Sequence, residues 1–149
     1  MIRTMRLPKV LLALTAAYFL TSLGHFSHNA EFICEYPKLP AWLTSAQVYA
    51  VWAAITSVGA AGLWLIRKRF AAAGLLLIAI YAALGFDGLG HYALAPMELH
   101  PLMANVTILS EVVTAALLLP VALWLLASHV FRGRKRPLNG LEPRSHFGG

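Results

Sequence analysis

The sequence predicts an all-α fold, an integral membrane four-helix bundle with its N and C termini in the cytoplasm. Hydrophobic residues make up 59% of the 149 residues and charged residues only 12%, whereas soluble domains have roughly 45–50% and about 25%. Most basic residues occur in three short runs, and these runs divide the chain into four apolar segments. This pattern excludes a soluble globular enzyme, and the high hydrophobicity excludes a chain that is disordered throughout.

The four expected helices cover residues about 10–29, 45–66, 70–91 and 102–131. Each has enough residues to cross about 30 Å of hydrocarbon at about 1.5 Å per residue. A signal peptide is an alternative for the first segment, but no small-x-small cleavage site follows it, so we interpret it as a span. Thr44 or Ser45 is the expected N-cap of the second helix. We therefore expect a four-transmembrane-helix domain over 1–132 and a basic, disordered cytoplasmic tail over 133–149.

Charge predicts the orientation of the spans. Ten of the twelve lysines and arginines fall on one side of a four-span arrangement, and an excess of basic residues marks the cytoplasmic side. In a bacterium the chain would be a multi-pass protein of the inner (plasma) membrane. The ten basic residues are Arg3, Arg6, Lys9, Arg67, Lys68, Arg69, Arg132, Arg134, Lys135 and Arg136, and the opposite side carries Glu31, Glu35, Lys38, Asp87 and Glu98.

Five ionisable residues of three helices fall in one layer of the predicted bundle. Counted from the basic run at the end of each helix, they lie roughly 24–33 Å deep, in a layer about 10 Å thick. Each charge within a span costs about 2.5–3.5 kcal/mol on insertion scales, so their common depth indicates a functional site. In a continuous third helix, Asp87 and His91 would be i, i+4 neighbours on one face. The five residues are His25, His28, Asp87, His91 and Glu111.

The depth of Glu111 depends on the end of the last helix from which it is counted. Counted from Pro101, Glu111 lies roughly 15 Å deep, near the bilayer centre. We prefer the count from Arg132, because the last helix is longer than a span and its outer end is expected to project or tilt. A polar stripe also runs along the first helix at about 100° per residue, which places it on one face. The stripe consists of Thr15, Tyr18, Ser22, His25 and Asn29.

Three imidazoles and two carboxylates are side chains that suit a divalent transition metal. Histidine nitrogen binds zinc, copper or iron, and a carboxylate adds a hard oxygen and compensates charge. The preferred hypothesis from the sequence is a metal site with Glu111 either as a ligand or as the partner of a ligand histidine. Haem b between His91 and His25 or His28 is the rival cofactor, although its propionates would face an acidic surface. The expected metal ligands are His25, His28, Asp87, His91 and Glu111.

The same residues support a second class of function, a cofactor-independent acid/base enzyme. Buried histidines and carboxylates exchange protons, as an isomerase- or hydrolase-like reaction on a lipophilic substrate requires. A small transporter or a structural subunit of a membrane complex is the third class. The sequence leaves open whether the protein is an enzyme and what it acts on. The candidate catalytic residues are His25, His91, Asp87 and Glu111, with Tyr18, Tyr49 and Trp52 lining the apolar part of the site.

Other features of the sequence are less specific. Serine and threonine stripes are typical of helix packing as well as of sites. His100, Cys34 and Met103 lie near the expected mouth of the site, and the sequence does not decide whether they join it. The expected partners are the lipid bilayer, a lipophilic small molecule, and further copies of the chain or other membrane proteins. Nucleic acid is not an expected partner, because the basic residues form runs between spans rather than one basic face.

Overall fold

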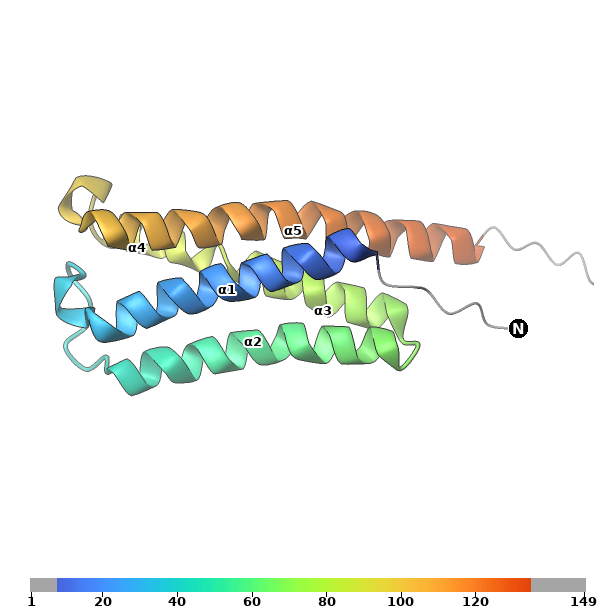
Figure 1. The fold of residues 1–149 in the computed structure, drawn as a ribbon, viewed down its shortest axis with the longest axis horizontal. Coiled ribbons are helices and arrows are strands. Elements are labelled where there is room, and N and C mark those ends of the chain that lie inside the picture. Colours follow the sequence, from blue (N-terminus) through green and yellow to red (C-terminus); the bar gives the residue numbers. More distant parts are fainter. Residues whose placement is uncertain (1–7, 135–149) are drawn as a thin grey trace, which may run out of the picture.

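The structure is a computed structural model that describes residues 8–134, and this part of the chain is all-helical with no strand. Four long helical segments form an up-and-down bundle (Figure 1). Helix α1 packs on α2 and α5, and α3 packs on the same two helices. The predicted all-α four-helix arrangement is therefore confirmed. The long helices are α1 (Lys9–Glu31), α2 (Ser45–Arg67), α3 (Ala71–Leu84) and α5 (Leu102–Arg134), and the shorter ones are η1 (Ile33–Glu35), η2 (Asp87–Leu89), α4 (Gly90–Leu94) and η3 (Met97–Leu99).

Four segments of the described chain are long and apolar enough to cross a membrane, which indicates a multi-pass membrane protein. Large apolar side chains such as Leu20, Val113 and Leu117 are exposed on the outside of the bundle, where lipid would cover them. The segments are Lys9–Glu31, Ser45–Arg67, Ala71–Leu94 and Leu102–Arg132. Helix α5 continues through Arg134, two residues past the predicted end of the four-helix domain, and the rest of the predicted tail lies outside the described residues.

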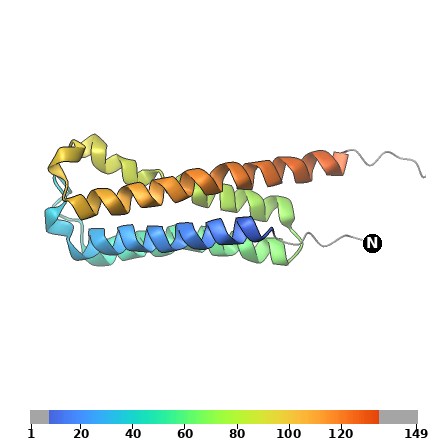
Figure 2. The same cartoon turned by 45° about the horizontal axis from the view of Figure 1, so that its top comes forward.

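The two ends of the bundle differ in what they carry. The basic end holds the start of α1, the turn between α2 and α3, and the end of α5, with Lys9, Arg67, Lys68, Arg69 and Arg132. The loop end consists of segments 32–44 and 95–101. Figures 1 and 2 show that α5 extends past the other helices at the basic end, whereas its start is level with them at the loop end. The expectation that its outer end projects is wrong, because the surplus length lies at the basic end.

The third span is broken, so the predicted continuous helix over 70–91 is wrong. Helix α3 ends at Leu84, and the chain continues through η2 into α4. Hydrogen bonds from Gly85 N to the Ala82 carbonyl (3.1 Å) and from Phe86 N to the Ala83 carbonyl (3.3 Å) replace the α-helical pattern at the break. A Cβ atom at Gly85 would lie 2.6 Å from Cε2 of Tyr18, so glycine allows α1 to approach closely here. These tighter bonds keep backbone groups paired where lipid offers no partner.

The half of the bundle nearer the basic end contains the main apolar core. Its central side chains are fully buried and come from α1, α3 and α5. Helices α2 and α3 touch through Gly62 and Gly74, because a Cβ atom at Gly74 would lie 2.5 Å from the Gly62 carbonyl oxygen. Small residues that allow such backbone contact are typical of membrane helix interfaces. The core includes Leu11, Tyr18, Leu75, Ile78, Tyr81 and Leu118.

Local hydrogen bonds fix the loop end. Thr44, one of the two N-caps that the sequence predicts, caps α2 and forms a capping box with Gln47. The Ser45 hydroxyl donates to the Ala30 carbonyl at 2.6 Å and ties the start of α2 to the end of α1. Tyr49 of α2 donates to Glu31 at 2.9 Å. The loop end is therefore held in place above the polar side chains described next.

Candidate functional site

A group of polar side chains, here called the histidine cluster, lies inside the loop end. Four of the five predicted site residues belong to it, and two residues from the loops complete it. The polar stripe predicted along α1 is confirmed, since all five of its members are buried. The histidine cluster consists of His25 and His28 of α1, Tyr36 after η1, His91 of α4, His100 before α5, and Glu111 of α5.

The centre of the cluster is a pair formed by His25 and Glu111. Each residue is 2% exposed, and His25 Nε2 lies 3.8 Å from Glu111 Oε2. This distance allows ion pairing but is too long for a direct hydrogen bond. Neither Glu111 Oε2 nor His25 Nδ1 has a hydrogen-bond partner among the described residues. A Cβ atom at Gly88 would lie 3.5 Å from Glu111 Oε2, so the backbone of η2 comes close to the pair.

Two further histidines connect this pair to the loops. The ring centroids of His25 and His91 are 5.4 Å apart, and those of His91 and His100 are 6.2 Å apart. Both pairs meet edge to face, with interplanar angles of 77° and 80°. His100 Nδ1 donates to the Pro96 carbonyl at 3.2 Å, because a carbonyl only accepts. His100 Nε2 is then the acceptor nitrogen, and it has no partner within residues 8–134.

Tyr36 packs from the loop onto the cluster. It is 3% exposed, and its ring centroid lies 4.9 Å from that of His91. The Tyr36 hydroxyl and His28 Nδ1 are hydrogen-bonded at 2.9 Å. Burial raises the pKa of Tyr36 to about 12, so the hydroxyl is neutral at physiological pH. His28 therefore joins the cluster through Tyr36 at its rim.

Asp87, the fifth predicted site residue, has an exposed side chain at the start of η2. Asp87 and His91 both follow the break in the third span, Asp87 in η2 and His91 in α4, which continues directly from η2. Their predicted common face stays a prediction. His91 is half-buried and receives a long hydrogen bond of 3.4 Å from Asn29 Nδ2.

The sequence does not identify Tyr36 as a site residue and leaves His100 undecided. His100 is buried and belongs to the cluster, whereas the side chains of Cys34 and Met103 are exposed. The position of His100 directly before Pro101, at the expected start of a helix, places it at the depth of the loop end. Tyr36 has no comparable signal, because the fold of the loop brings it to His91, a residue 55 positions later in the sequence.

The arrangement of the rings bears on metal binding. Within residues 8–134, no three side chains of histidine, cysteine, aspartate or glutamate are grouped as metal ligands. The imidazoles instead pack edge to face, as aromatic rings do in a core. The described chain thus holds no group of three metal ligands, and cofactor binding stays a prediction.

Comparisons with protein-family models, with curated proteins and with solved structures gave no match for this chain. Inference about its function therefore rests on the site itself. The property that distinguishes the site is the number of buried polar atoms that have no partner in the described part of the chain. In the histidine cluster and beside it on α1, these atoms are Ser22 Oγ, His25 Nδ1, Asn29 Oδ1, His91 Nδ1, His100 Nε2 and Glu111 Oε2.

Proposed function

We propose that this protein is a membrane enzyme that transfers protons on a lipophilic substrate, with His25 and Glu111 as its acid/base pair. The observation that carries the proposal is the pair itself. Two ionisable side chains from different helices lie 3.8 Å apart at 2% exposure, and their facing atoms are not hydrogen-bonded to each other. A buried base and a buried acid at this spacing are typical of sites that exchange protons.

The chemistry follows from the gap between the two groups. A reacting atom must lie within about 2.6–3.2 Å of the group that gives or takes its proton. A substrate atom beside the line that joins His25 Nε2 and Glu111 Oε2 can lie within this distance of both, so one group can donate a proton while the other accepts one. The result is a 1,3-proton shift, which is an isomerisation. It leaves the base with one proton more and the acid with one fewer, so a proton must pass from the base back to the acid before the next turnover. The pair needs no external oxidant or reductant for this step.

The other histidines supply a route between the pair and the aqueous face. His91 and His100 follow His25 at ring-centroid distances of 5.4 and 6.2 Å toward the loop end. Imidazole accepts a proton on one nitrogen and releases one from the other, so a row of imidazoles relays protons. In our proposal the basic end faces the cytoplasm, as the excess of basic residues there favours, and the relay opens on the opposite side.

Infrared titration tests whether Glu111 and His25 form one proton-exchanging unit. The protein, purified without a histidine tag and placed in nanodiscs, is titrated while the carbonyl band of protonated carboxyl groups is recorded. We expect Glu111→Gln to remove one band, and His25→Gln to move the pH at which that band disappears. The matched control is His129→Gln, because His129 is exposed on α5 far along the chain from Glu111. A band that titrates identically in the wild type and in His25→Gln would overturn the pairing.

Deuterium exchange tests the enzymatic part of the proposal. Nanodiscs that contain the protein and a total membrane lipid extract are incubated in deuterated water, and the extracted lipids are analysed by mass spectrometry. We expect deuterium to enter one lipid class at carbon, with at least a tenfold loss of rate in Glu111→Gln and in His25→Gln. Glu98→Gln, outside the cluster, is expected to keep the full rate. Exchange that is equal in wild type and Glu111→Gln contradicts an enzymatic role for the pair.

A divalent metal is the second candidate, because a nitrogen and an oxygen 3.8 Å apart can both reach one ion at ligand distances of about 2.0–2.2 Å. We would measure metal content on the same tag-free protein. About one equivalent of zinc, copper or iron, lost in both His25→Ala and His91→Ala, would favour the metal over cofactor-independent chemistry. A haem would be recognised in the same samples by its Soret absorption.

A further inference from the structure

The polar interior of the bundle continues below the histidine cluster toward the basic end. One face of α1 is buried and polar at every turn from Asn29 to Thr15, and it becomes apolar at Leu11. The polar part covers roughly 21 Å of helix rise, against about 30 Å of hydrocarbon. Polar side chains therefore line the interior over about two-thirds of the thickness of the membrane.

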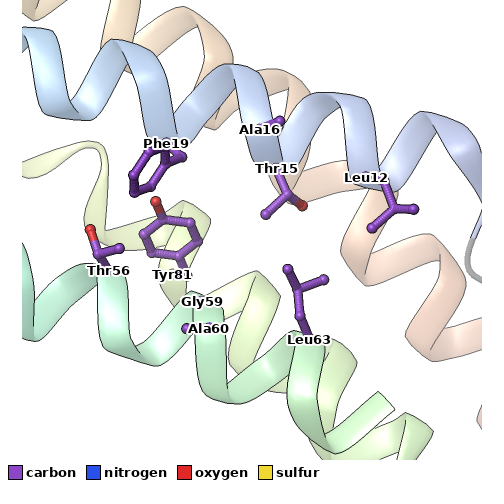
Figure 3. A pocket seen from close by; sticks show the side chains of 9 residues that line it. All are labelled: Leu12, Thr15, Ala16, Phe19, Thr56, Gly59, Ala60, Leu63 and Tyr81. Atoms are coloured by element: carbon purple, nitrogen blue, oxygen red, sulfur yellow. The ribbon is translucent and has the colours of Figure 1, made fainter. Parts of the chain in front are cut away.

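A series of side chains, here called the hydroxyl file, leads from Glu111 into the middle of the bundle. Ser22 lies beside both the Glu111 carboxyl group and the Tyr18 hydroxyl. The rings of Tyr18 and Tyr81 follow, with centroids 4.5 Å apart. Thr56 lies beside the Tyr81 hydroxyl, and both hydroxyls are turned toward α1 (Figure 3). The file consists of Glu111 of α5, Ser22 and Tyr18 of α1, Tyr81 of α3 and Thr56 of α2, so all four long helices contribute to it.

The hydroxyls of the file are buried and make no bond to the backbone. Ser22 and Tyr18 are 0% exposed, and Tyr81 is 2% exposed. Hydroxyls within spans often donate to a carbonyl of the preceding turn, as Thr15 does to Leu11 at 2.7 Å. None of the four hydroxyls in the file does so within residues 8–134. Each can therefore turn its proton toward the next side chain of the file.

Groups that both donate and accept hydrogen bonds can pass a proton along a row. When a proton reaches one hydroxyl oxygen, the proton already on that oxygen moves to the next group, so one proton enters the row and one leaves it. No bond between heavy atoms changes, and no oxidant or reductant is needed. In the proposed relay, His25 supplies protons to Glu111, and the hydroxyl file continues that route toward the basic end.

Leucines end the polar interior on the side of the basic end. Leu11 of α1, Leu75 of α3 and Leu118 of α5 are fully buried and belong to one core cluster with Tyr18 and Tyr81. We call these three residues the leucine layer. They offer a proton no group to bond to, and moving an ion into an apolar interior is costly. The leucine layer therefore separates the file from the basic end.

We propose that the bundle holds a proton pathway across the membrane, which runs along the histidine cluster and the hydroxyl file and is closed by the leucine layer. The pathway goes beyond the acid/base reaction, because proton movement needs no substrate. It shares Glu111 with the proposed pair and rests on proton exchange at that residue. Proton flux and deuterium entry into lipid are separate measurements, so either proposal can fail while the other stands.

Proton flux into liposomes tests the pathway. The protein is reconstituted around a trapped pH-sensitive dye, and a potassium diffusion potential set with valinomycin drives protons inward. Leu11→Ser extends the polar face of α1 by one turn, almost to Lys9, and we expect at least about a tenfold higher flux than in the wild type. Leu12→Ser is the matched control, because Leu12 is partly exposed on the outside of the bundle. Equal flux in the two variants overturns the proposal, and so does a wild type that conducts as fast as Leu11→Ser.

A second substitution determines whether the flux follows the file. Tyr18→Phe, added to Leu11→Ser, removes the hydroxyl and keeps the ring, and it should return the flux to within about twofold of the wild type. Tyr49→Phe in the same background is the control and should leave the flux high, because Tyr49 lies outside the file. If Leu11→Ser does not fold, Leu118→Ser replaces it, with Leu117→Ser on the exposed face as control. A flux that Tyr18→Phe leaves unchanged, or no rise in either buried leucine variant, overturns the pathway.

Discussion

The two halves of this bundle are built in opposite ways. Toward the basic end, apolar side chains are fully buried and α2 touches α3 through Gly62 and Gly74. Toward the loop end, the interior holds the histidine cluster, with several polar atoms that have no partner within the described residues. Close packing stabilises a membrane bundle, whereas unpaired polar groups destabilise it. The comparison teaches that close packing, which stabilises the bundle, and the polar side chains on which the proposed function rests lie in different halves of the molecule.

The substitution with the largest expected effect on stability is Gly74→Leu, in the half toward the basic end. A Cβ atom at Gly74 would already lie 2.5 Å from both the Gly62 carbonyl oxygen and Ile66 Cγ1. A leucine must therefore push α2 away from α3, and we expect a loss of at least about 3 kcal/mol, the upper part of the usual cost of overpacking. Unfolding in a denaturing detergent, followed by circular dichroism, measures it. Gly24→Leu is the control, since no described atom lies within 4 Å of its added Cβ.

The second test concerns the half toward the loop end. Here we expect the substitution to raise the free energy of unfolding, not to lower it. Replacing both members of the central pair, with His25→Leu and Glu111→Leu together, should raise the free energy of unfolding by about 1–2 kcal/mol. Buried ion pairs replaced by apolar residues are often neutral or stabilising by about 1–4 kcal/mol. Proton exchange should be lost at the same time. The same unfolding assay applies, with His129→Leu as the control, and a marked destabilisation would show that the pair holds the loop end together.

The third test uses pH. Burial raises the pKa of Tyr36 from 10.0 to about 12, so folding favours its neutral form. The stability from this effect is complete below pH 10 and is lost as pH rises from 10 to 12. Ultraviolet absorbance of tyrosinate, recorded beside the unfolding curve, should show this step, and Tyr36→Phe should lack it. At neutral pH Tyr36→Phe should cost about 1 kcal/mol through the lost bond to His28.

The smallest expected effect lies where the two halves meet. Thr21 of α1 and Thr114 of α5 are hydrogen-bonded at 2.7 Å. Bonds between membrane helices contribute about 0.6 kcal/mol on average, so Thr21→Val should lower the free energy of unfolding by about that amount. Thr15→Val is the matched control, because Thr15 bonds only to the Leu11 carbonyl of its own helix. Equal losses in the two variants would contradict a contribution from the bond between helices.

Much of this architecture could be predicted from the sequence because it depends on local periodicity and composition. Apolar segments of span length predict four helices, and a repeat of about 100° per residue predicts which face of α1 is buried. The layer that contains His25 and Glu111 was also predictable, since depth follows from counting residues along a helix of fixed rise. The depth of Glu111 was counted from Arg132 because the outer end of α5 was expected to project. That expectation was wrong, since α5 extends past the other helices at the basic end (Figure 1).

The remaining features depend on contacts between distant parts of the chain. The break in the third span lies in a segment with three glycines, Gly85, Gly88 and Gly90, which weaken a helix locally. The contact of Gly85 with Tyr18 is between distant parts of the chain. Asp87 and His91 both follow the break, but the Asp87 side chain is exposed while the His91 ring packs against His25. The burial of Tyr36 depends on how a loop with two prolines folds over α4.

The interruption between α3 and α4 also determines how force passes through the molecule. A continuous helix is a stiff rod that carries an axial pull from one end to the other. The third span is instead two helices joined through a turn and η2, and only the helix that ends at Leu84 is anchored in the closely packed half. A pull on the segment around Met97 therefore extends the turn and η2 before it loads α3. In a single-molecule pulling experiment, the loop end should detach as a separate early step and leave the remaining bundle intact.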